Sequence, residues 1–213
     1  MGRIYVHGLG QSPGSWEGTL LRLGADNGSV CPNLAALPRS GKVSYPELYA
    51  AFAEFCGAFN GPIDFCGLSL GGVLALHYTA EHPGMVRSLA LIATPYKMPK
   101  ALLRFQNLLF RLLPASAFQQ AGFGKPDFLS LCGSMADLDF SGSLHKITCP
   151  SLVVCGGEDG ANRKASAALA NALPNAEFRV IRGSGHEVNT DAPEQLAAVL
   201  AAFYRRLPQP PTV

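Results

Sequence analysis

The chain has 213 residues, 48% of them hydrophobic, which is enough for one sizeable core with a small appendage. Its 17 basic and 15 acidic residues leave a net charge of +2, so charge gives no argument for a nucleic-acid partner. No apolar run reaches the length of a membrane span, and the start of the chain lacks the pattern of a secretory signal. We expect no membrane insertion.

Six cysteines show neither a Cys-x-x-Cys pair nor metal-type spacing with the five histidines. Two of them, Cys66 and Cys155, fall inside apolar runs, where a free thiol behaves as a small hydrophobe. The pattern predicts reduced thiols in a cytoplasmic protein, and we expect neither a metal nor a cofactor.

A first strand is predicted at residues 4–6, followed directly by a glycine-rich turn at 7–13. Because its backbone can approach a ligand closely, we interpret the turn as a loop that supplies an oxyanion donor, the N–H of Leu9. The alternative is an ordinary strand-to-helix turn, leading into a helix at 16–23.

The next two elements carry local signals of their own. Pro32 lies within a predicted strand at 30–34, and because proline cannot donate a ladder hydrogen bond, this strand is expected at a sheet edge. Apolar residues at helical spacing predict a helix at 45–59, with Ser44 as its N-cap and Glu47 placed as in a capping box.

A Gly-x-Ser-x-Gly pattern follows a short apolar strand at 62–66 and precedes a helix that should end near His82, before a proline. A serine at such a sharp turn has a strained backbone, and side chains two residues away would collide with it, so Gly67 and Gly71 fit there. The pattern predicts Ser69 as a nucleophile raised above the sheet.

An apolar strand at 88–93 continues the alternation of strands and helices, which indicates a parallel sheet covered on both faces. The alternation stops at residues 97–144, where the clearest element is a helix-like run at 100–113. We interpret the basic face of this run as a solvated stripe, with attraction to an acidic substrate or lipid as the alternative. Its basic residues are Lys97, Lys100, Arg104 and Arg111.

The alternation resumes with strands at 151–155 and 177–181 and helices at 164–173 and 193–206. The proline-rich tail at 207–213 is expected to fray.

A serine nucleophile needs a base and a group that orients the base. Among the five histidines, His186 lies in a glycine-flanked loop after the last strand, where open α/β sheets place their sites. Asp159 follows the strand at 151–155 and is our choice of acid, with Glu158 as its rival. The chain order Ser69, Asp159, His186 agrees with this architecture.

With these residues assembled, the chain resembles the α/β-hydrolase family over nearly its whole length. The landmarks are His7-Gly8 followed by Trp16, the run Gly67 to Gly72, Gly157 to Asp159, and Gly185-His186 with Pro193-Glu194.

The resemblance implies an α/β fold with a mostly parallel sheet flanked by helices. It also implies a core formed by residues 1–96 and 145–213, with a short helical cap at 97–144. Ile4 leaves no room for the two strands that usually begin the family's sheet, so we expect about six strands.

For the site, the resemblance implies Ser69 as nucleophile, Asp159 as acid and His186 as base. It implies an oxyanion hole made by the N–H groups of Leu9 and Leu70. Substrate contacts are expected from Gln11, Tyr96, Leu102 and Phe105.

These features predict a hydrolase for carboxylic esters with a small or medium acyl group. One alternative keeps the three residues for a thioester, lactone or carbon–carbon hydrolase, a cofactor-free haloperoxidase or a hydroxynitrile lyase. The other is a ligand-binding receptor or scaffold, because a fold does not determine a function.

Overall fold

The computed structural model describes residues 2–24, 28–37, 43–98, 114 and 123–208. Within them six strands form one sheet in the order β2-β1-β3-β4-β5-β6, and each neighbouring pair is parallel. The strands are β1 (Gly2–Val6), β2 (Ser29–Val30), β3 (Ile63–Leu68), β4 (Val86–Ile92), β5 (Ser151–Gly156) and β6 (Ala176–Ile181). The predicted six-stranded parallel sheet is confirmed.

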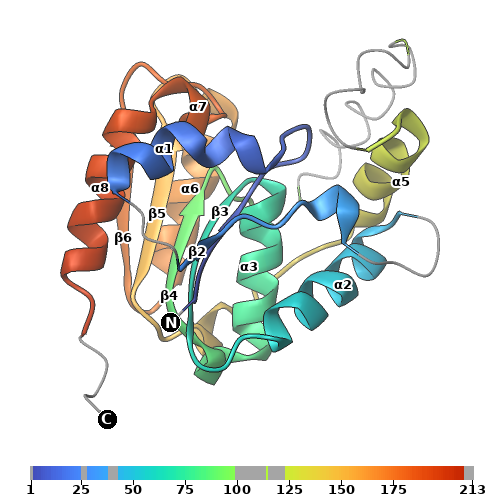
Figure 1. Cartoon of the computed structure of the whole chain (residues 1–213), viewed down its shortest axis with the longest axis horizontal. Coiled ribbons are helices and arrows are strands. Elements are labelled where there is room, and N and C mark those ends of the chain that lie inside the picture. Colours follow the sequence, from blue (N-terminus) through green and yellow to red (C-terminus); the bar gives the residue numbers. More distant parts are fainter. Residues whose placement is uncertain (1, 25–27, 38–42, 99–113, 115–122, 209–213) are drawn as a thin grey trace.

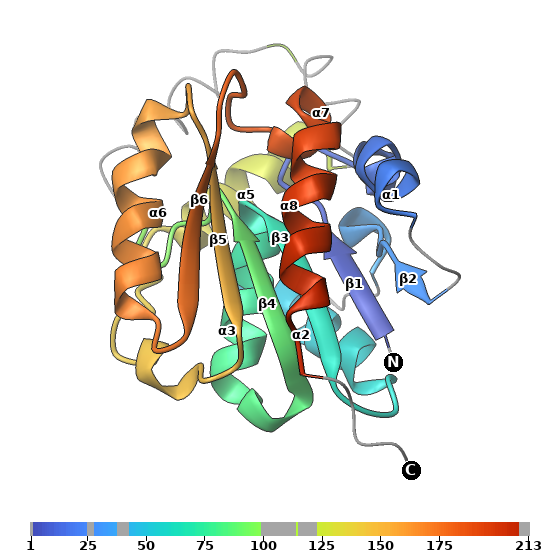
Figure 2. The same cartoon turned by 90° about the vertical axis from the view of Figure 1, so that its left-hand side faces the viewer.

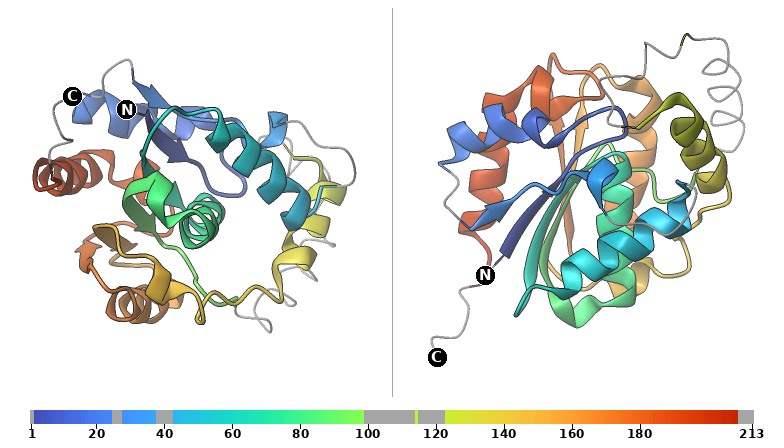
Figure 3. Two further views of the ribbon diagram at one scale, coloured as in Figure 1. Left: turned by 90° about the horizontal axis from the view of Figure 1, so that it is seen from below. Right: turned by 45° about the vertical axis from the view of Figure 1, so that its right-hand side comes forward.

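Helices cover both faces of this sheet. Figure 1 places α1 and α8 on one side and α2 and α3 on the other, and Figure 2 looks onto the face covered by α8. The same layers appear from below in Figure 3. The described helices are α1 (Glu17–Leu23), α2 (Tyr45–Gly57), α3 (Leu70–Glu81), α5 (Lys125–Met135), α6 (Gly160–Ala172), α7 (Val188–Asp191) and α8 (Pro193–Arg205). Short 3-10 turns are η1 (Pro13–Trp16), η2 (Leu34–Ala36), η3 (Pro83–Met85) and η5 (Leu144–Lys146).

Two apolar clusters, one on each face, form the core. Ile4 and Val6 of β1 pack into the cluster that contains residues of α2, α3 and α6, whereas Tyr5 packs with Trp16 and α8. Successive strand residues point to opposite faces, and here both faces are covered. This arrangement explains why the strands are apolar throughout rather than alternating.

The predicted strand at 30–34 is too long. β2 contains only Ser29 and Val30, and it is an edge strand as expected, but Pro32 lies beyond it. Proline cannot extend the ladder, and Asn33 instead accepts the N–H of Ala35 at 3.1 Å and starts η2.

The start of α6 also differs from the prediction. α6 begins at Gly160 rather than 164, because the carboxylate of Asp159 accepts the N–H of Asn162 and caps the helix. The short helix α7 was not predicted at all. The predicted cap of α2 is present, since the Ser44 hydroxyl accepts the N–H of Glu47 at 3.4 Å.

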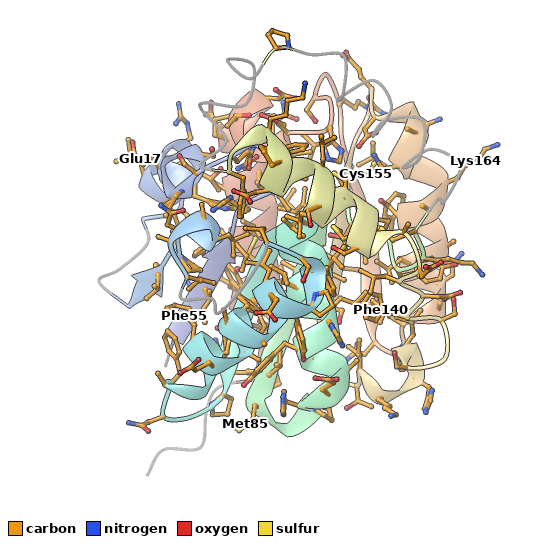
Figure 4. All side chains as sticks on the ribbon, turned by 90° about the vertical axis from the view of Figure 1, so that its right-hand side faces the viewer. Glu17, Phe55, Met85, Phe140, Cys155 and Lys164 are labelled. Atoms are coloured by element: carbon orange, nitrogen blue, oxygen red, sulfur yellow. The ribbon has the colours of Figure 1, made fainter. Side chains whose placement is uncertain are left out.

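α5 is the described helix between β4 and β5, and it lies toward the carboxyl ends of the strands (Figures 1 and 4). The predicted helix at 100–113 lies outside the described residues. Of the predicted basic stripe, Lys97 is described, and its ammonium forms an ion pair with Asp139 at 2.9 Å. In the described part of the chain, no helix has both the length and the apolar character needed to cross a bilayer.

Candidate active site

Ser69 occupies the turn between β3 and α3, in the left-handed backbone region with φ 51° and ψ −114°. Its N–H donates to the carbonyl of Ile92 at 2.8 Å, which ties the turn to the end of β4. Left-handed geometry at a residue other than glycine costs roughly 1–3 kcal/mol, so the surrounding contacts must hold it.

The two glycines of the pattern make this turn possible. A Cβ on Gly67 would lie 2.5 Å from the carbonyl oxygen of Gly71, and one on Gly71 would overlap the carbonyl of Val6. Both positions therefore exclude a side chain, as the sequence predicted. The turn packs directly onto the end of β1, next to the glycine-rich loop.

His186 and Asp159 meet from two separate loops. Nδ1 of His186 lies 2.8 Å from Oδ2 of Asp159, and the Asp159 side chain is only 5% exposed. The Asp159 carboxylate accepts the Nδ1 proton, so the other ring nitrogen, Nε2, keeps a free lone pair. Glu158, the rival acid, is exposed.

The glycine-rich loop after β1 is held by two buried polar side chains. His7 Nδ1 lies 2.9 Å from the carbonyl oxygen of Gly8, and its Nε2 lies 3.2 Å from the N–H of Leu34. Burial lowers the pKa of His7, which favours a neutral ring that donates at one nitrogen and accepts at the other.

Gln11 is the second of these side chains. Its Oε1 accepts the N–H of Gly8 at 3.3 Å, and its amide forms a reciprocal pair with Asn189, both bonds being 3.1 Å. Asn189 also donates to the carbonyl of Ser15. Because Gln11 is buried and occupied in this way, its geometry favours a structural role over the predicted contact with substrate.

A cavity of about 190 Å³ brings the separate loops together. Its lining is mostly apolar, and α5 supplies much of one wall. The lining residues are Leu9, Ser69, Leu70, Val73, Pro95, Met98, Phe128, Cys132, Met135 and His186.

Ser69, His186, Leu9 and Leu70 therefore share one cavity, and Asp159 contacts His186 from behind. The N–H of Leu70 is the first of α3, and the first N–H groups of a helix have no intrahelical acceptor. The positive end of the helix dipole also points toward the cavity.

The remaining predicted contacts are less direct. Tyr96 lies in the chain between two lining residues, Pro95 and Met98, but its side chain packs against the core. Leu102 and Phe105 lie outside the described residues.

A larger hollow of about 410 Å³ lies near the amino ends of β5 and β6, lined by residues that include Ser151, Glu177 and Arg206. Glu177 is paired there with Arg206, and the hollow contains neither Ser69 nor a histidine. Size alone is therefore a poor guide to the reactive site in this chain. Among the described residues, no group of three or more His, Cys, Asp or Glu side chains is placed to bind a metal ion.

Two residues of the site were missed by sequence reasoning, Asn162 and Asn189. Asn162 lies three positions after Asp159, the spacing of a helix cap, and this spacing is a signal that could have found it. Asn189 has no such signal, because its partner Gln11 is far away in the sequence.

Comparisons of this chain with known proteins identify one family. A sequence model described as "Alpha/beta hydrolase family" matches residues 4–199. A pimeloyl-[acyl-carrier protein] methyl ester esterase from Chromobacterium violaceum is 28% identical, over 81% of this chain and 87% of that enzyme. A proline iminopeptidase from Heyndrickxia coagulans is 31% identical, over 37% of this chain and only 27% of that enzyme.

Among solved structures, a thermophilic esterase from Thermogutta terrifontis superimposes with a TM-score of 0.80. The match covers 97% of this chain and 90% of the esterase, at 20% sequence identity. At this identity the likeness concerns the fold.

Proposed function

The chain belongs to the alpha/beta hydrolase family and is a hydrolase, and from this premise we propose that it cleaves carboxylic esters of small or medium acyl groups at Ser69. The observation that carries the proposal is the shared cavity. A serine on a strained turn and a histidine oriented by a buried carboxylate both open into it.

In the proposed reaction, Ser69 Oγ attacks the ester carbonyl while Nε2 of His186 accepts the hydroxyl proton. Asp159 orients the imidazole and stabilises the imidazolium that forms. The N–H groups of Leu9 and Leu70 stabilise the negative oxygen, and one such donor typically contributes roughly 3–4 kcal/mol. His186 then protonates the leaving alcohol, and water releases the acyl group by the same steps in reverse.

The cavity supports the choice of acyl group. Its volume of about 190 Å³ is below the roughly 300–1,000 Å³ of typical small-molecule pockets, which supports a small or medium acyl group. Its walls include Met98, Phe128 and Met135, which suit an apolar chain rather than a charged one.

We also propose that residues 97–144 form a cap over this cavity. The support is that Phe128, Cys132 and Met135, all on α5, contribute to the cavity wall. All six cysteines are free thiols, which supports a reducing compartment such as the cytoplasm.

A fluorophosphonate probe tests the nucleophile, because it labels only an activated serine. Wild type should be labelled and Ser69→Ala should not, and Ser69→Ala should lose on the order of 10⁶-fold in kcat on nitrophenyl esters. Equal labelling of the two proteins would refute the proposal. Nitrophenyl esters of increasing acyl length then test the size of the acyl group.

The acid is tested by a matched pair of variants. Asp159→Asn should lower kcat by roughly 10⁴-fold, as for a triad that loses its orienting charge, whereas the exposed neighbour Glu158→Gln should leave it unchanged. If Glu158→Gln lowered kcat more than Asp159→Asn, Glu158 and not Asp159 would be the acid that orients His186.

A further inference from the structure

Asn162, in the first turn of α6, contacts both the proposed base, His186, and the side chain that orients it, Asp159. Its Nδ2 lies 2.9 Å from Oδ1 and 2.9 Å from Oδ2 of Asp159. The same nitrogen lies 3.2 Å from Nδ1 of His186, which is a contact between two donor nitrogens and not a hydrogen bond when Nδ1 gives its proton to Asp159. Among the described residues, no other side chain has a polar atom within hydrogen-bond distance of both Asp159 and His186.

The hydrogen-bonding capacity of the three groups determines how they share protons. An ionised carboxylate only accepts, and an amide nitrogen carries two hydrogens. Oδ1 of Asp159 therefore receives the backbone N–H of Asn162 and Oδ2 receives Nδ1–H of His186, while one amide hydrogen of Asn162, whose nitrogen is 2.9 Å from both oxygens, is shared between them. Three donor groups in this arrangement fix the plane of the carboxylate.

Helix capping alone does not explain the side chain of Asn162. The cap of α6 is the bond from the backbone N–H of Asn162 to Asp159, at 3.3 Å. The side-chain amide satisfies no orphan N–H of the helix, because both of its bonds end on the carboxylate. What these bonds control is the direction in which Asp159 faces His186.

We propose that Asn162 is a positioning residue, which holds the Asp159 carboxylate in the plane that keeps the His186 proton on Nδ1 and leaves Nε2 free toward Ser69. The proposal rests on the proposed function of the site. Without the side chain of Asn162, the carboxylate keeps the backbone bond on Oδ1 and the His186 bond on Oδ2 but rotates more freely, so the imidazole is held less firmly in one tautomer and orientation.

The first test replaces Asn162 by alanine. Misplacement of a reacting group by about 1 Å can cost roughly 10²-fold, so kcat on a nitrophenyl ester should fall by about that factor with KM unchanged. Asn162→Gln, which carries the same donors on a longer arm, should recover part of the loss. Turnover equal to wild type in Asn162→Ala would overturn the proposal.

The second test uses charge. Asn162→Asp is nearly isosteric, but it places a second carboxylate beside the imidazole and favours its protonated form. The lower-pH limb of the kcat/KM profile should therefore move to higher pH. An unmoved limb would mean that the side chain does not act on His186.

Ser44→Ala is the matched control for a merely structural effect, because it removes the cap of α2. It should lower the melting temperature and leave kcat and the pH profile unchanged. If Asn162→Ala lowers only the melting temperature, as Ser44→Ala does, the positioning role is refuted.

Histidine ¹⁵N NMR separates failure of this inference from failure of the proposed function, because it requires no substrate. The His186 signals, assigned by their loss in His186→Gln, should report Nδ1–H in wild type and a mixture of tautomers in Asn162→Ala. An unchanged tautomer overturns the positioning role whatever the reaction is. If Ser69→Ala instead keeps full activity, it is the proposed function that fails.

Discussion

The reciprocal amide pair of Gln11 and Asn189 joins the glycine-rich loop to the segment after His186. Its contribution to the free energy of unfolding can be calculated from the hydrogen bonds that each substitution removes. Gln11→Ala leaves two buried groups without partners, the N–H of Gly8 and Oδ1 of Asn189. Asn189→Ala leaves the buried amide of Gln11 and the part-buried carbonyl of Ser15 without their side-chain partners. Each unsatisfied buried group costs about 1–3 kcal/mol, so Gln11→Ala should lose at least about 2 kcal/mol and Asn189→Ala at least about 1 kcal/mol.

The double variant should lose less than the sum of the two. When both side chains are alanine, only the N–H of Gly8 and the carbonyl of Ser15 still lack their partners. The double variant therefore contains two fewer orphaned groups than the two single variants together. The free energy of unfolding should deviate from additivity by about 2 kcal/mol or more.

Urea unfolding measures all four proteins of this cycle. The chain has one tryptophan, Trp16, which is fully buried and gives a fluorescence signal of unfolding, with far-UV circular dichroism as a second probe. As a control, Asn189→Ala combined with Ser44→Ala should be additive, because the two residues share no hydrogen-bond partner. Additivity within about 0.5 kcal/mol for Gln11 and Asn189 would refute the reasoning.

Three further expectations concern the sheet, the loop and the cavity. Asp64 is buried and its carboxylate accepts two hydrogen bonds from Arg87. Asp64→Asn should therefore lower the free energy of unfolding by about 2–4 kcal/mol and leave kcat unchanged. Urea unfolding measures this loss, and an unchanged unfolding midpoint would contradict the prediction. Burial lowers the pKa of His7, so the unfolded chain binds that proton more readily and stability should fall as the pH drops below about 6.5. His7→Gln should remove part of this loss of stability at low pH. If the variant and the wild type had the same dependence of stability on pH, His7 would be excluded as its cause. Met135→Ala widens the cavity and should shift the preferred nitrophenyl ester toward longer acyl chains, whereas an unchanged preference would place the chain elsewhere.

The sheet was predictable because its strands are short apolar runs that alternate with helices. This pattern gave six parallel strands, including the edge at β2. The length of β2 was not predictable, because pairing that ends after Val30 depends on the register with β1. Proline at position 32 was a correct signal of an edge and a poor guide to where the strand ends.

For the candidate site, the sequence located the residues that follow strand ends. Ser69, Asp159 and His186 each lie in such a loop, and parallel strands bring these loops to one edge. The supporting residues were less accessible, since their roles depend on contacts between distant segments. Gln11 illustrates the limit, because its place in the loop suggested a substrate contact and only its distance to Asn189 shows a buried pair.

Asp159 has two roles in one side chain, as the cap of α6 and as the partner of His186. A descendant that no longer needed the reaction would still be selected to keep a capping residue there, because losing it costs about 0.5–2 kcal/mol of stability. Asparagine caps a helix about as well as aspartate, but it cannot supply the charge. Relatives that have drifted away from hydrolysis should therefore carry asparagine at this position more often than alanine or valine.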